Sequence, residues 1–163
     1  MAITTSGLIP MLFALAGVMM TLRYLKGVSD LAGAIRCLFI GMGFVFLSKL
    51  LMFCVGFLGE TYYYLISLLC RLLSAVFITA SACGIKGIKI NPTALIVSVL
   101  LSIGWSWYVV VLTGDGSAMT LSLALSTLGY AALAAALWRR KGLRNTLGFV
   151  VTGWVCIFLV VYN

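Results

Sequence analysis

Six long apolar runs govern what this chain can fold into. They lie near residues 7–26, 34–58, 62–84, 92–113, 117–138 and 144–162. Each has about the 20 residues that an α-helix needs to cross a bilayer. Their apolar residues are continuous rather than alternating, and a backbone in lipid must satisfy its own hydrogen bonds, so helices are favoured over a β-barrel. The sequence therefore predicts an all-α integral membrane protein, with residues 1–163 forming one compact bundle of six transmembrane helices.

The composition and the short connections agree with this architecture. Of the 163 residues, 64% are hydrophobic and 9% are charged, whereas about a quarter of the residues in a soluble domain are charged. Because the connections are a few residues long, we expect neighbouring helices to pack antiparallel. The first segment, "MAITTSGLIP", lacks the basic region of a cleavable signal peptide, so we expect it to lead into the first helix.

The basic residues outside the helix interiors predict the orientation. They fall in the first, third and fifth connections, whereas the second and fourth connections carry only Glu60 and Asp115. The positive-inside rule places the basic connections in the cytoplasm, so both termini are predicted to lie outside. We expect the protein to reside in a bacterial cytoplasmic membrane. The same rule accounts for the formal net charge of +8, so we expect no nucleic-acid partner.

Basic clusters beside helix ends also predict contacts at the membrane surface, because lysine and arginine there are attracted to anionic lipid headgroups. We expect six of these residues to contact headgroups or a partner protein. They are Lys86, Lys89, Arg139, Arg140, Lys141 and Arg144.

The missing residue types argue against catalysis. The chain has no histidine, and its three acids, Asp30, Glu60 and Asp115, lie near connections rather than inside helices. A buried carboxylate pair and an imidazole base are therefore both lacking, as is a histidine-rich metal site. The five cysteines include no CxxC pair and are best explained as small apolar residues. We expect a protein without enzymatic activity, metal or cofactor.

Two cations interrupt the apolar segments. In "SKLLMFCVGFLGETYYYLISLLCRLLS", Lys49 and Arg71 each lie eleven residues from Glu60. Two antiparallel helices would place both about 16 Å from the turn, near the middle of a hydrocarbon core about 30 Å thick. Each costs on the order of 2.5–3.5 kcal/mol at that depth. Keeping both is easiest if an anion is bound between them, or if Lys49 loses its proton. The alternative is that both side chains extend to the headgroups or bind backbone carbonyls.

Hydroxyl residues recur at helical spacing near these cations. Ser67 and Ser74 lie four residues before and three residues after Arg71, on the same helix face. Ser98, Ser102 and Ser106 form one stripe, and Ser122, Ser126 and Tyr130 form another. Such stripes usually indicate close packing with interhelical hydrogen bonds. The alternative is a polar wall of a cavity or pore.

Two function hypotheses remain from the sequence. In the first, the protein binds or passes an anionic or amphiphilic ligand within the bundle, through Lys49, Arg71, Ser67, Ser74, Ser102 and Ser126. In the second, it is a membrane subunit or sensor that acts through partner proteins or homo-oligomerisation, with its basic loops as docking sites.

The layout also resembles the multi-helix sensor regions that precede diguanylate cyclase or histidine kinase domains. The segments that carry this resemblance are "LRYLKG", "GIKGIKI" and "WRRKGLRNTLG". They are signals of topology rather than a motif, and the C-terminus is predicted to lie outside, so we assign no family from them.

The predicted topology can be tested by cysteine labelling in a variant without native cysteines. In intact cells, a membrane-impermeant maleimide should modify Ser117→Cys, in the fourth connection, and should not modify Gly142→Cys, in the fifth. The reverse pattern would show that the basic connections face outward.

Overall fold

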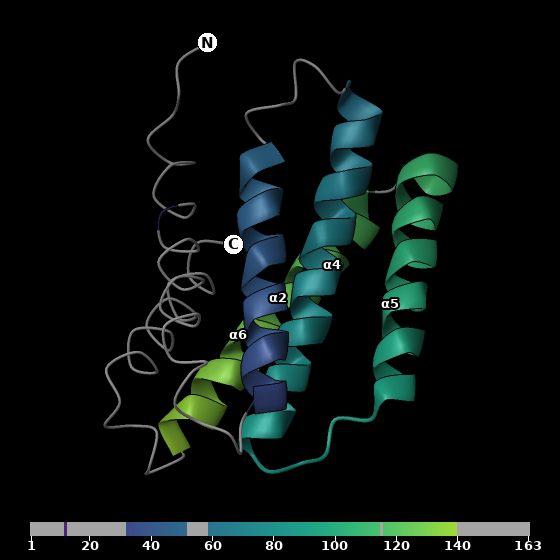
Figure 1. The fold of residues 1–163 in the computed structure, drawn as a ribbon. Helices are drawn as coiled ribbons and strands as arrows, with labels where there is room; N and C mark the ends of the chain where they lie inside the picture. Colours follow the sequence, from purple (N-terminus) through teal and green to yellow (C-terminus); the bar gives the residue numbers. More distant parts are fainter. Residues whose placement is uncertain (1–11, 13–31, 52–58, 115, 140–163) are drawn as a thin grey trace.

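The described part of the chain is helical throughout. The computed structural model describes residues 12, 32–51, 59–114 and 116–139. Helices α2 (Ala32–Leu50), α4 (Glu60–Ile85), α5 (Pro92–Trp107) and α6 (Gly116–Arg139) are joined by short connections, and a π-helix, η3 (Tyr108–Thr113), continues α5 (Figure 1). These residues contain no strand. The predicted all-α class is therefore confirmed for the described residues.

Three of the described helices, Ala32–Leu50, Glu60–Ile85 and Pro92–Thr113, are long and apolar enough to cross a membrane. They agree with an integral membrane protein and begin within two residues of the predicted runs 34–58, 62–84 and 92–113. The predicted first and sixth helices, near 7–26 and 144–162, lie outside the described residues. Six spans and an outward orientation of both termini thus remain predictions.

The ends of α5 and η3 follow from local chemistry. Asn91 caps α5, its side chain accepting a hydrogen bond from the Thr93 N–H at 3.0 Å, and Pro92 occupies the first helical position. At the other end, Gly114 has a φ of 61° and donates its N–H to the Val109 carbonyl at 2.8 Å, which closes the π-helical turn. The left-handed backbone at Gly114 is one that glycine adopts without steric cost.

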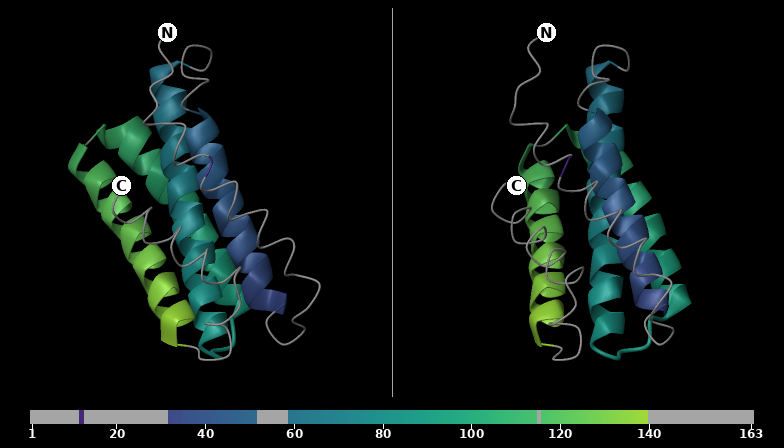
Figure 2. Two further views of the ribbon diagram at one scale, coloured as in Figure 1. Left: turned by 90° about the vertical axis from the view of Figure 1, so that its left-hand side faces the viewer. Right: turned by 60° about the vertical axis from the view of Figure 1, so that its left-hand side comes forward.

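Helix α4 is the central element, because it contacts α2, α5, η3 and α6. Figure 2 shows α2 and α6 on either side of α4. The α2 contact buries a row of apolar side chains, which includes Ile35, Leu38 and Met42 of α2 and Ile78 and Ile85 of α4.

Small residues allow the helices to approach α4 closely. A Cβ atom placed on Gly41 of α2 would lie 2.7 Å from the Ile78 side chain and 3.2 Å from its backbone nitrogen. A Cβ on Gly84 of α4 would lie 2.8 Å from the Ala34 Cβ. On the opposite side, a Cβ on Gly129 of α6 would lie 3.4 Å from the Ala75 carbonyl oxygen. Glycine at these contacts brings the backbones together, as is typical of helix packing in membranes.

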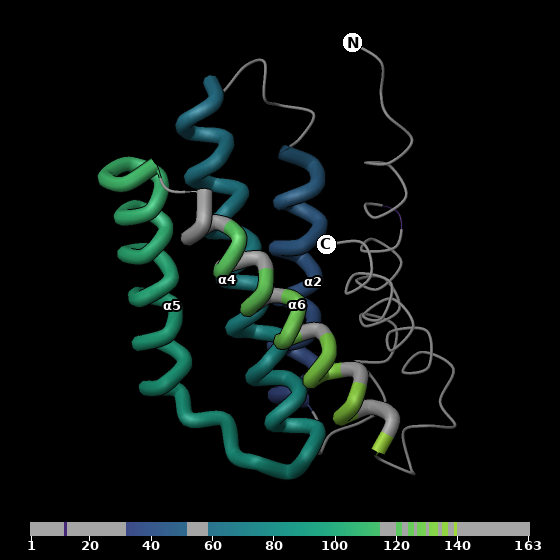
Figure 3. The backbone as a smooth tube through the Cα atoms, turned by 180° about the vertical axis from the view of Figure 1, so that it is seen from behind, coloured from purple at the N-terminus to yellow at the C-terminus, as the bar shows by residue number. Residues whose placement is uncertain are grey.

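The expectation that consecutive helices pack against each other is wrong for α5 and α6. The chain turns back at Gly114. Helix α6 then crosses to pack along α4, and α5 stands apart from α6 (Figure 3). The close contact of Gly129 with α4 explains this choice, since it lets α6 approach a helix other than its sequence neighbour. Helix α5 consequently buries little surface, and only Ser102 and Ser106 among its residues are buried.

The basic residues near the ends of the described helices all lie at one end of the structure. The start of α2, the end of α4, the start of α5 and the end of α6 all lie at the lower end in Figure 1. Arg36, Lys86, Lys89 and Arg139 therefore belong to that end, whereas Glu60 begins α4 at the other. This separation agrees with the alternation of charge among the connections, and the cytoplasmic assignment of the basic end remains a prediction.

The glycine contact between α2 and α4 generates a packing prediction. Gly41→Ala should lower the free energy of unfolding by about 1–3 kcal/mol, because Ile78 is fully buried and cannot move away from the new methyl group. Gly43→Ala, two residues further along α2, is the matched control, since nothing lies within 4 Å of its added Cβ. It should be neutral, or stabilising by up to about 1 kcal/mol through helix propensity. Unfolding in mixed detergent micelles would measure both, and equal effects would contradict the close approach.

Candidate functional site

The structure brings Lys49 and Arg71 together between α2 and α4. Lys49 lies in the last turn of α2 with 8% of its surface exposed, and Arg71 lies partly buried in α4. Arg71 is close enough for its charge to repel that of Lys49. Two residues that the sequence places at equal distances from Glu60 are thus neighbours in space.

The Arg71 guanidinium has an unusual environment. Its Nε atom is buried and donates no hydrogen bond to any described residue. A buried donor without an acceptor costs about 1–3 kcal/mol, and more when the group is charged. An acceptor at this position would therefore stabilise the site.

Two hydroxyl groups meet across the α2–α4 contact. The Oγ atoms of Ser48 and Ser67 are 3.5 Å apart across the α2–α4 contact, and both residues are buried. Ser67 lies one helical turn before Arg71 on the same face of α4, so the Ser48–Ser67 contact lies within about one turn of Arg71. Sequence reasoning identified Ser67 but left out Ser48; the signal available was its position beside Lys49, opposite a serine at similar depth. We call Ser48, Lys49, Ser67 and Arg71 the α2–α4 polar cluster.

Ser74 is hydrogen-bonded to the backbone of its own helix. Its Oγ donates a hydrogen bond of 2.7 Å to the Arg71 carbonyl oxygen, one turn earlier in α4. A serine hydroxyl bonded back to its own helix in this way satisfies itself within the helix. Ser74 thus borders the cluster through the Arg71 backbone.

The serine stripe of α5 bonds within its own helix. The hydroxyls of Ser98, Ser102 and Ser106 donate to the carbonyls of Ala94, Ser98 and Ser102, each at 2.8 Å. The expectation of interhelical hydrogen bonds is therefore wrong for these three residues. The hydroxyls remain bonded where α5 stands away from α4, because a carbonyl four residues earlier is always within reach.

Ser102 and Ser126 are not part of the described polar cluster. Ser102 instead lines a groove of about 600 Å³ between α4, α5 and α6, and the groove's described lining includes neither Lys49 nor Arg71. Ser126 belongs to α6, but its side chain is outside the described part of the structure.

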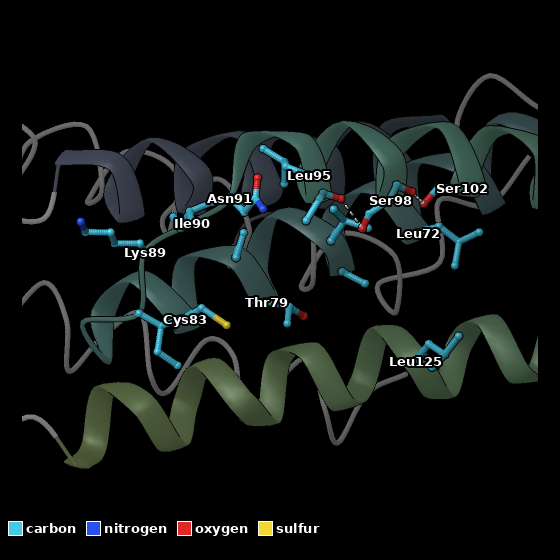
Figure 4. Close-up of a pocket in the computed structure, with 15 residues that line it drawn as sticks. Leu72, Thr79, Cys83, Lys89, Ile90, Asn91, Leu95, Ser98, Ser102 and Leu125 are labelled. Atoms are coloured by element: carbon cyan, nitrogen blue, oxygen red, sulfur yellow. Dashed lines mark hydrogen bonds between the residues drawn. The ribbon is translucent and has the colours of Figure 1, made fainter.

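The sequence analysis left a cavity wall open as the alternative for the serine stripe of α5, and Ser98 and Ser102 of that stripe line this groove. Figure 4 shows it bounded by Thr79 and Cys83 of α4, by Ser98 of α5 and by Leu125 of α6. The recurrence of Ala94, Ser98 and Ser102 every four residues was the available signal, since small side chains on one face leave space beside a helix.

Three of the six residues expected to contact headgroups or a partner lie in the described part of the chain. Lys86, Lys89 and Arg139 are exposed, and Lys89 lines one end of the groove. Arg140, Lys141 and Arg144 lie outside the described residues. In the described ranges, no three histidine, cysteine or acidic residues gather in a group that could hold a metal ion.

The comparisons with known proteins found no relative: no family model matches the chain, and no curated protein or solved structure matches it. The function must therefore be argued from the geometry of the chain itself. The α2–α4 polar cluster offers two cationic groups and two hydroxyls, which suit the binding of an anion.

Proposed function

We propose that this is a non-enzymatic membrane protein that binds or passes an anionic or amphiphilic ligand between α2 and α4. The observation that carries the proposal is the buried Arg71 Nε beside the buried Lys49. Like charges repel about four times more strongly at an effective dielectric constant near 20 than in water. An anion bound to both would relieve the repulsion and accept the Arg71 N–H.

The chain supplies no nearby carboxylate in its described ranges. Glu60 is the only acidic residue there, and it lies exposed at the start of α4, about 16 Å along the helix from Arg71. This separation supports an external acceptor for the buried Arg71 Nε. The low exposure of Lys49 also favours an interior site over a side chain that extends to the headgroups.

The shape of arginine narrows the ligand class. Its planar guanidinium forms paired hydrogen bonds with carboxylate or phosphate oxygens, whereas a lysine ammonium acts as a compact point charge. The Ser48 and Ser67 hydroxyls add short-range donors and acceptors on the same level. A carboxylate or phosphate group with an apolar tail would suit both this cluster and the surrounding apolar helices.

A second candidate is a membrane subunit or sensor in which a partner protein's acidic residue takes the place of the ligand. The exposed Lys86, Lys89 and Arg139 at one end of the helices favour this alternative, because they could dock an acidic soluble surface. The two candidates differ in what occupies the space beside Arg71.

Replacing Arg71 tests the proposal. Arg71→Leu should weaken binding of radiolabelled oleate or inorganic phosphate to the purified protein by about 10- to 150-fold, the equivalent of one charge-assisted hydrogen bond. Insertion should be preserved, since leucine costs less than arginine in a membrane helix. Arg71→Lys should also bind the probes weakly, because it keeps the positive charge but loses the planar guanidinium that forms paired hydrogen bonds.

Arg36→Leu is the matched control, because Arg36 is an exposed arginine near the start of α2. It should leave binding of both probes unchanged. Full binding by Arg71→Leu, or an equal loss in both variants, would contradict the site. Loss of a co-purifying protein with an intramembrane acid in Arg71→Leu, without probe binding by the wild type, would instead favour the subunit or sensor.

A further inference from the structure

The groove between α4, α5 and α6 is distinct from the polar cluster. Its described wall runs from Lys89 and Asn91, in the connection before α5, to Leu72 and Ser102 (Figure 4). Asn91 and Ser102 are eleven residues apart, so this stretch extends about 16 Å along α5. That is close to half of a hydrocarbon core about 30 Å thick. The groove therefore has the depth of one leaflet.

The interior of the groove suits hydrocarbon. Leu72, Val76 and Leu95 contribute apolar side chains, and alanines leave space between them. The two serines on its α5 wall, Ser98 and Ser102, already donate their hydroxyls to carbonyls of their own helix. Hydroxyls that are satisfied in this way place little demand on an occupant for hydrogen bonds.

The end of the groove carries positive charge. Lys89 is exposed at this end, and Figure 4 shows its amino group extending away from the groove interior. The only described acid, Glu60, begins α4 at the opposite end of the helices. An occupant with an apolar tail and an anionic head would therefore match both the apolar interior and the positively charged end of the groove.

The size of the groove suits a single hydrocarbon chain. Its volume of about 600 Å³ falls within the roughly 300–1,000 Å³ of small-molecule sites. An α-helix with its side chains is about 10–12 Å across. A single hydrocarbon chain is much narrower and would be enclosed on the sides formed by α4, α5 and α6.

We propose that the groove holds one acyl chain of an anionic membrane lipid, with the lipid headgroup at Lys89. The apolar wall provides affinity for the chain, and Lys89 provides preference for the charged headgroup. A lysine beside an anionic membrane surface is worth about a fivefold preference. This inference does not depend on the anion site at Arg71.

Native mass spectrometry provides the test. The protein is reconstituted in vesicles of equal parts phosphatidylglycerol and phosphatidylcholine, transferred to mild detergent and examined for retained lipid. We expect one retained phosphatidylglycerol molecule per chain, in about fivefold excess over phosphatidylcholine. Lys89→Gln should reduce that excess to near equality. Lys86→Gln is the matched control and should preserve the excess, because Lys86 is exposed but does not line the groove.

A substitution that fills the groove distinguishes lipid bound at this site from lipid bound elsewhere on the protein. Ala94→Trp should reduce lipid retention at least fivefold, because Ala94 lines the groove. Ala131→Trp should retain the lipid, since Ala131 is exposed on α6 and does not line it. Arg71→Leu should also retain the lipid, so failure of the anion site would be distinguished from failure of the lipid site.

Cys83 gives a second measurement that uses the unaltered groove. With Cys83 as the only cysteine, adding phosphatidylglycerol should slow its modification by a membrane-permeant maleimide several-fold, and phosphatidylcholine should slow it less. The proposal is overturned if the wild type retains no lipid, or if neither lipid protects Cys83. It is also overturned if Lys86→Gln and Lys89→Gln act alike, or if Ala94→Trp abolishes a dimer instead of lipid retention.

Discussion

The close approach of α2 and α6 to α4 is the contact on which the rest of the described structure depends. Lipid tails are as apolar as leucine, so helices in a membrane gain little from burying apolar surface and associate through tight packing. Gly41 and Gly129 each permit such packing, one on α2 and the other on α6. Because α4 is contacted on both sides, its residues face two environments. The face with Ser67, Arg71 and Ile78 meets α2, and the face with Leu72, Ala75 and Thr79 meets the groove and α6.

This arrangement explains how one helix can carry a cationic cluster and an apolar groove. Successive residues of an α-helix point about 100° apart, so Arg71 and Leu72 belong to different faces although they are adjacent in sequence. A charge that is costly in hydrocarbon is thereby placed near Lys49 rather than in the described lining of the groove. The polar cluster is compact because α2 can approach α4 closely at Gly41, about two turns from Lys49.

The sequence predicted the elements more reliably than their arrangement. Continuous apolar runs indicated the helices, and Asn91 with Pro92 indicated where α5 begins, because capping is a local property. The neighbourhood of Lys49 and Arg71 also followed from counting along one antiparallel hairpin. The position of α6 did not, since it depends on a contact between Gly129 and α4 that no local pattern specifies. The same non-local contact decides that α5 and α6 leave a groove, so Thr79 and Cys83 could not be assigned to a site from sequence.

The π-helix η3 gives the groove its upper limit. Val109 is fully buried and packs against Leu68 and Leu72 of α4, which holds the α5–η3 segment to α4 at that level. Below this cluster the α5 wall carries Ser102, Ser98 and Ala94, whose small side chains cannot fill the space to α4. Helix α5 is therefore held to α4 by a large residue at one end and separated from it by small residues toward the other. A groove that runs from Lys89 and Asn91 to Ser102, below the cluster around Val109, is the geometric result of that change in side-chain size.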